Sequence, residues 1–114
     1  MKNILKSIVF MTMAGLTISG CMNMTTHPDE ITGSYTSRLN YKNFSCNELF
    51  AELGSLTRRE NVLVEAQERR VKKSKVQAFW WGIGQGDGVE AAELADVRGE
   101  KEAVRTAIDA NGCR

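Results

Sequence analysis

The chain has 114 residues, with 15 Lys or Arg, 14 Asp or Glu and a formal net charge of +1 at pH 7. This near balance excludes the basic footprint of a nucleic-acid-binding protein. One histidine and three cysteines, none at zinc-ligand spacing, predict no metal site.

Residues 1–20 have the pattern of an export signal. Lys2 and Lys6 precede an uncharged, mostly apolar run at 7–18, and small residues follow it. The run is too short to span a hydrocarbon core of about 30 Å. We therefore expect a signal peptide that is removed rather than a transmembrane helix.

A cysteine ends this segment. Ile18-Ser19-Gly20-Cys21 resembles the bacterial lipobox, in which an aliphatic and two small residues precede a cysteine. The resemblance implies a diacylglyceryl group on the Cys21 thiol, cleavage before it and acylation of the new amine, often with palmitate. Two or three acyl chains anchor a protein stably. The alternative is an ordinary signal peptide with a chance cysteine.

Residue 22 is Met rather than Asp. By resemblance to enterobacterial sorting signals, this implies delivery to the outer membrane, with the protein facing the periplasm. Cleavage removes 20 of 114 residues and leaves 94, which suits one small domain of the size that often needs a cross-link such as a disulfide for stability. Residues 21–30 are polar and contain the only proline, so they predict a flexible tether in which His27 is solvated rather than a ligand.

Residues 31–44 show a partial apolar alternation that places Ile31, Tyr35, Leu39 and Tyr41 on one face of an extended chain. We interpret this segment as a strap that lays those four side chains against a helical surface, because no second strand is visible. The alternative is a donor strand that pairs with a partner's sheet edge.

A first helix is predicted over 45–78. Ser45 and Glu48 form a capping box, and Phe44 and Leu49 a hydrophobic staple. Apolar or core-type residues then recur at spacings of threes and fours, forming one stripe: Leu49, Phe50, Leu53, Leu56, Leu63, Val64, Gln67 and Val71.

Four alternating glycines within 79–88 predict a turn. A second helix is predicted over 89–111, with Asp87 and Glu90 as a second capping pair and Gly112 as a left-handed cap. Small residues at spacings of four predict a close approach of the two helices: Ala91, Ala95, Gly99, Ala103 and Ala107.

The predicted fold is therefore all-α, an antiparallel two-helix hairpin with an N-terminal extended strap. Residues 58–75 sum to +4 and residues 87–109 to −4, a pattern that favours the antiparallel pairing. Cys46 and Cys113 then meet at one end, and an oxidising compartment predicts a disulfide between them.

The spacing of Ile31, Tyr35, Tyr41, Cys46, Leu49 and Glu52, followed by Ala95, Arg98, Gly99, Glu100, Ala103 and Cys113, resembles a widespread group of small, uncharacterised proteobacterial lipoproteins. This resemblance implies a disulfide-closed helical hairpin on an envelope lipoprotein. It implies no activity or substrate.

No nucleophile, base and orienting group stand together in the sequence, so we expect no enzyme. The glycine run lacks the Gly-Lys-Ser/Thr ending of a phosphate-binding loop, and no cofactor is expected besides the lipid.

One feature points beyond the fold. Phe79, Trp80 and Trp81 follow the basic residues Lys72, Lys73 and Lys75, a combination that suits a membrane interface or an anionic partner. The alternative is that the aromatic residues cap the core. We expect a structural or interaction role in the outer membrane, with an envelope protein as a possible partner. The alternative function is a small-ligand or peptide-binding module that uses a groove between strap and hairpin.

Overall fold

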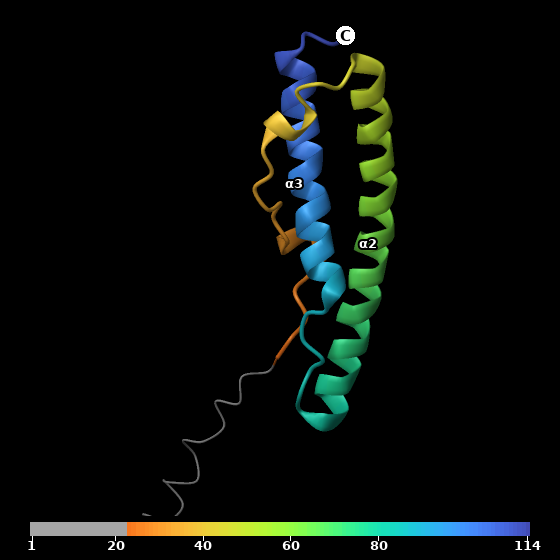
Figure 1. Ribbon diagram of the computed structural model, residues 1–114. Coiled ribbons are helices and arrows are strands. Elements are labelled where there is room, and N and C mark those ends of the chain that lie inside the picture. Colours follow the sequence, from red (N-terminus) through yellow and green to blue (C-terminus); the bar gives the residue numbers. More distant parts are fainter. Residues whose placement is uncertain (1–22) are drawn as a thin grey trace, which may run out of the picture.

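The computed structural model describes residues 23–114 and shows two long helices packed side by side in opposite directions (Figure 1). Helix α2 spans Cys46–Trp81 and helix α3 spans Val89–Ala110. Two short 3-10 turns precede them, η1 at Pro28–Glu30 and η2 at Arg38–Tyr41, and residues 23–114 contain no strand. The predicted all-α hairpin is confirmed.

Helix α2 begins where the capping box places it. The Ser45 hydroxyl accepts from the Glu48 amide at 3.3 Å, and the Glu48 carboxylate accepts from the Ser45 amide at 2.7 Å. This backbone hydrogen bond is the main cause of a lowered pKa at Glu48.

The other end of α2 differs from the prediction by three residues. The helix continues through Trp81 and ends at Gly82, whose φ of +73° is left-handed and whose amide donates to the Ala78 carbonyl at 2.9 Å. The aromatic residues are helix formers of ordinary quality, so only the glycine ends the helix. Residues 79–81 therefore form the last helical turn instead of the loop.

The predicted capping pair of the second helix is wrong. The N-cap of α3 is Gly88, and no side chain bonds there. The Asp87 carboxylate binds Thr26 and Gln67 instead. At the other end, Gly112 has a φ of +64° and follows the C-cap Asn111, as predicted.

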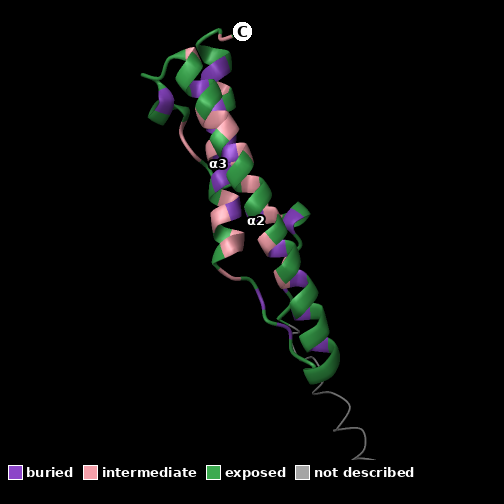
Figure 2. Cartoon of the chain, turned by 90° about the vertical axis from the view of Figure 1, so that its right-hand side faces the viewer, coloured by how far each residue is buried: buried purple, intermediate pink, exposed green. Residues whose placement is uncertain are grey.

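The core is a single seam between the helices (Figure 2), to which the strap adds one aromatic side chain. Its buried members are Tyr41, Leu49, Leu56, Leu63, Leu94, Val97, Ala103, Val104, Ala107 and Ile108. Phe50, placed in the stripe by sequence, is exposed. Two ion pairs join the helices, with the basic residue on α2 and the acidic residue on α3, as the charge pattern predicts. They are Arg59 with Glu93 at 3.9 Å and Arg70 with Glu90 at 3.4 Å.

A disulfide closes one end of the hairpin. Cys46 and Cys113 are bonded, with Cα atoms 5.5 Å apart and a sequence separation of 67. The pairing predicted from the compartment and the helix ends is thus confirmed in the structure.

Residues 31–37 of the strap run along α3 without helical structure, and η2 follows them (Figure 1). The Ser34 amide donates to the Ala95 carbonyl at 2.9 Å, and a Cβ added at Gly99 would lie 1.8 Å from the Ser34 carbonyl oxygen. Gly99 therefore makes room for the strap rather than for α2, which corrects the prediction that it lets the two helices approach.

Half of the strap's predicted apolar face is wrong. Ile31 packs against the core and Tyr41 is buried, but Tyr35 is 92% exposed and Leu39 is 64% exposed. The backbone contact at Ser34 holds this segment, so its middle side chains are left in solvent.

Candidate functional site

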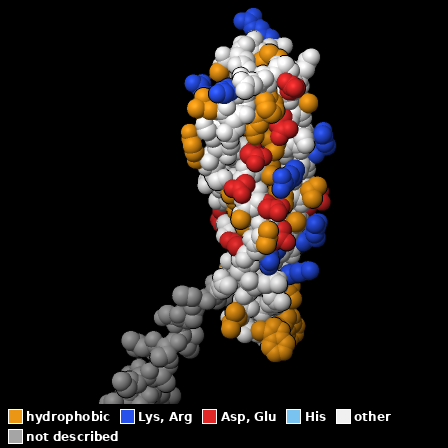
Figure 3. Space-filling view, viewed as in Figure 1, with side chains coloured by type: hydrophobic (Ala, Val, Ile, Leu, Met, Phe, Trp, Pro, Cys, Tyr) orange, Lys and Arg blue, Asp and Glu red, His pale blue; other side chains and the backbone are white. Residues whose placement is uncertain are grey.

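The free end of the hairpin exposes a group of apolar side chains that we call the aromatic tip: Phe79, Trp80, Trp81 and Ile83 (Figure 3). Their side chains are 81%, 72%, 82% and 66% exposed. Phe79 and Trp80 pack edge to face with ring centroids 5.3 Å apart. The aromatic residues therefore do not cap the core, because most of their surface faces solvent.

Three exposed lysines lie directly above the aromatic tip on α2: Lys72, Lys73 and Lys75. Within residues 23–114 none of them forms an ion pair, and the sequence has no acidic residue between Glu68 and Asp87. The last three turns of α2 thus change from basic to apolar along the helix axis.

The chain returns from the tip through residues 82–88, which lie against the end of α2. The Gln85 amide donates to the hydroxyl of the fully buried Ser74 at 3.0 Å. A Cβ added at Gly84 would lie 2.5 Å from that hydroxyl oxygen and 2.6 Å from the Asn23 carbonyl. Glycine is needed here because two other parts of the chain come so close.

The first described residues bind to this return. The Gly86 amide donates to the Asn23 carbonyl at 2.9 Å, and the Thr25 hydroxyl donates to the Gly86 carbonyl at 2.8 Å. The Thr26 amide donates to the Asp87 carboxylate at 2.7 Å. Pro28 is buried as well. The flexible tether predicted over 21–30 is therefore replaced, over 23–30, by a packed segment.

A buried amide joins these parts to α2. Gln67 is fully buried and donates through Nε2 to the Thr26 carbonyl and to Asp87, both at 2.9 Å. Burial raises the pKa of Asp87, but the hydrogen bonds from Thr26 and Gln67 outweigh it, and the pKa is lowered. One signal of this network is visible in the sequence, the glutamine in an otherwise apolar stripe. Its partners carry no hydrophobic periodicity and could not be found that way.

A charged cluster, separate from the network around Gln67, lies between the helices near the middle of their length. The Glu60 carboxylate accepts from Arg98 Nε at 2.8 Å and from Lys101 Nζ. Arg98 also donates to the Pro28 carbonyl at 2.6 Å and to the Ile31 carbonyl. Burial raises the pKa of Glu60, but the two cations lower it by more. These charges hold the N-terminal segment to both helices.

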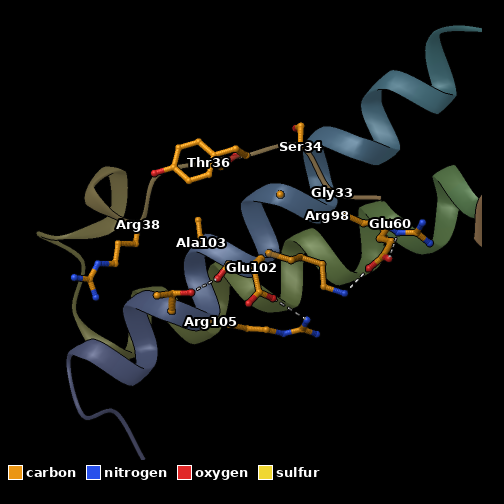
Figure 4. Close-up of a pocket in the computed structure, with 13 residues that line it drawn as sticks. Gly33, Ser34, Thr36, Arg38, Glu60, Arg98, Glu102, Ala103 and Arg105 are labelled. Carbon is orange, nitrogen blue, oxygen red and sulfur yellow. Dashed lines mark hydrogen bonds and ion pairs between the residues drawn. The ribbon is translucent and has the colours of Figure 1, made fainter. Parts of the chain in front are cut away.

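Beside this cluster, a groove of about 770 Å³ separates the strap from α3 (Figure 4). Gly33, Ser34 and Thr36 line one side, and Arg98, Lys101 and Arg105 line the other. Three of its basic side chains already form ion pairs: Arg98 and Lys101 with Glu60, and Arg105 with Glu102 at 3.9 Å.

The remaining predicted residues lie elsewhere. Cys21 is outside the described residues, and the disulfide lies at the opposite end from the aromatic tip. The half-exposed His27 contacts Asp29, 3.2 Å away. Residues 23–114 hold no cluster of His, Cys, Asp and Glu that could bind a metal ion. Nor does this part of the chain contain a helix of the length and apolarity that crossing a membrane needs.

Comparisons with known proteins give no relative: no family model, no curated protein and no solved structure matches this chain.

Proposed function

We propose that the protein is a lipid-anchored outer-membrane lipoprotein with a structural or interaction role in the cell envelope. The observation that carries this proposal is the position of Asn23. Cys21, the lipobox cysteine, stands only two residues before it, and Asn23 is hydrogen-bonded to the return at the aromatic tip. Two peptide units span about 7 Å. A lipid on Cys21 would therefore be attached at the end of the hairpin that carries the aromatic tip.

This attachment gives the domain an orientation. Helix α2 has 36 residues, which at 1.5 Å per residue makes it about 54 Å long. With one end tied to a membrane, the disulfide end stands away from it, toward other envelope components. Exposed Tyr35 and Leu39 on the strap belong to that distal half. A domain held in this way can act as a spacer or adaptor between the membrane and another envelope component, and this role needs no catalytic group.

The anchor is tested with Cys21→Ser, expressed in a bacterium that processes lipoproteins. We expect the wild-type protein to be recovered with membranes, with an acylated Cys21 at its mature N-terminus by mass spectrometry. The Cys21→Ser protein should be uncleaved or released, and Ser19→Ala, which keeps a small residue before the cysteine, should behave as wild type. Normal cleavage and membrane recovery of Cys21→Ser would contradict the proposal.

The groove beside the strap favours a second candidate function, a periplasmic module for a small ligand or peptide. It lies where this alternative requires it, between strap residues Gly33–Arg38 and α3. A thermal-shift screen of small anions and short peptides tests it. A ligand whose stabilisation is lost in Arg38→Ala would support this candidate, because Arg38 lines the groove and is exposed. The paired state of the other charges makes it the second choice.

A further inference from the structure

We propose that the aromatic tip inserts into the interface of the same bilayer that holds the lipid on Cys21, with an anionic phospholipid surface as its partner. This inference rests on the proposed lipid anchor. It assigns a partner to the site and fixes which end of the hairpin meets the membrane.

The first support is where the described chain begins. In Figures 1 and 2 the described chain starts beside the tip end of the hairpin, and the hydrogen bonds from Gly86 and Thr25 hold it there. Cys21 is separated from Asn23 by one residue, so an anchored lipid brings the aromatic tip to the lipid surface without any rearrangement of the domain.

The second support is the order of side chains along α2. Lys72 and Trp80 are eight residues apart, which corresponds to about 12 Å along a helix. The headgroup layer of each leaflet is roughly 5–8 Å thick. Aromatic side chains at the acyl boundary would thus place Lys75 within the headgroup layer and Lys72 just outside it. The long aliphatic stems of the lysines would let their ammonium groups reach the phosphates.

The third support is charge. Lys72, Lys73 and Lys75 give the last three turns of α2 a charge of +3, with no acidic residue before Asp87. Basic residues beside a membrane are attracted by anionic lipids. A protein partner with an apolar socket would explain the tryptophans, but it would leave the adjacent lysine cluster and the nearby anchor unexplained.

The two tryptophans are the only ones in the chain, so tryptophan emission, excited selectively over tyrosine, reports on the tip alone. The native lipidated protein is reconstituted into vesicles of phosphatidylethanolamine and phosphatidylglycerol, floated on a density gradient and measured for emission. Lipids brominated on the acyl chain then serve as contact quenchers. We expect a blue shift of the emission and quenching by the brominated lipids.

The two readouts separate the two proposals. Protein that floats with vesicles but whose emission is neither shifted nor quenched would overturn the tip insertion and leave the anchor standing. Quenching in protein whose Cys21 carries no lipid would overturn the anchor and leave the tip contact standing. Failure of both flotation and quenching would overturn both.

Variants locate the contact. Phe79→Ala/Ile83→Ala keeps both tryptophans and should weaken the quenching, with little change in melting temperature because both side chains are exposed. Lys72→Gln/Lys73→Gln/Lys75→Gln should lower the affinity of the tip for anionic vesicles about a hundredfold at low salt, read as loss of quenching. Lys42→Gln/Arg58→Gln/Arg114→Gln removes the same charge from exposed positions toward the disulfide end and should leave quenching unchanged. Equal loss in both triple variants would contradict the insertion of this end.

Discussion

The two ends of the hairpin are held by different interactions. At the disulfide end, Cys46 and Cys113 are joined covalently, and Leu49 and Ile108 are buried beside them. At the tip end, no covalent bond joins the described segments, and the return is held by hydrogen bonds to glycine backbone atoms at Gly86 and to Asp87. The disulfide end leaves Phe44 and Phe50 only 37% and 44% exposed, whereas the four apolar side chains of the aromatic tip are 66% to 82% exposed.

This difference separates side chains that fold the domain from side chains that need another explanation. The apolar surface of Leu49 leaves water on folding and stabilises the hairpin by roughly 2 kcal/mol. Trp80 and Trp81 keep most of their surface in water, so folding gains little from them. Large exposed apolar groups gathered in one place are typical of a contact surface. The aromatic tip, and not the disulfide end, is therefore the part of the hairpin to which we assign a contact function.

The largest expected effect is at the disulfide end. Removing the bond in Cys46→Ser/Cys113→Ser should lower the free energy of unfolding by about 4 kcal/mol, because the link closes a long loop in the unfolded chain. Urea unfolding of the variant and of wild type measures this. The native tryptophan emission should not change, because both tryptophans lie at the other end. A shifted native emission would show that the disulfide also affects the structure of the tip, and would contradict the view that the two ends are held independently.

The next expected effect concerns the strap. Gly99→Ala places a methyl group 1.8 Å from the Ser34 carbonyl oxygen, so the strap must move away. We expect a loss of about 2 kcal/mol in the free energy of unfolding. Gly54→Ala is the matched control, since its Cβ would meet only the end of the Arg58 side chain at 3.6 Å. That substitution should stabilise the helix by up to about 1 kcal/mol. Similar effects of the two substitutions would contradict the contact between Gly99 and the strap.

Local signals in the sequence predicted the elements well. The capping box at Ser45 and Glu48, the left-handed Gly112 and the apolar spacing from Leu49 to Val71 each depend on residues close in sequence. Such patterns define a hairpin and the end at which its cysteines meet. The predicted end of α2 is three residues too early, because the prediction places the aromatic residues 79–81 in the glycine-rich turn, whereas the helix continues up to the left-handed Gly82.

Contacts between distant backbone segments were not predictable in this way. The segment from Asn23 to Thr26 binds through carbonyls, amides and hydroxyls, whose partners lie about 60 residues away. Nothing in its composition distinguishes it from a solvated tether. The alternation predicts Tyr35 on the packed face of the strap, but the hydrogen bond at Ser34 sets the strap's position. The composition of the aromatic tip was visible in sequence, while its place beside the start of the domain required the structure.

The smallest expected effect tests the hydrogen bonds at the tip end. The pKa of Asp87 is lowered from its ordinary value of 3.8 in the folded state. A lowered folded pKa contributes stability that is fully present above the ordinary value and is lost as the pH falls through the folded value. Because the carboxylate is partly exposed and screened by solvent, we expect a contribution of about 1 kcal/mol.

Asp87→Asn removes the titrating group and keeps an oxygen that can accept from Thr26 and Gln67. The difference in unfolding free energy between wild type and Asp87→Asn should be constant at neutral pH. It should shrink as the pH falls below about 4, where the carboxylate of the unfolded wild-type chain binds a proton before that of the folded chain. Urea unfolding across this range measures it, with the exposed Asp109→Asn as control. Amide exchange at Gly86, whose N–H bonds to Asn23, should quicken in Asp87→Asn, while amides near Cys46 should not change. A pH-independent difference, with unaltered exchange at Gly86, would show that Asp87 does not hold the start of the domain to the tip.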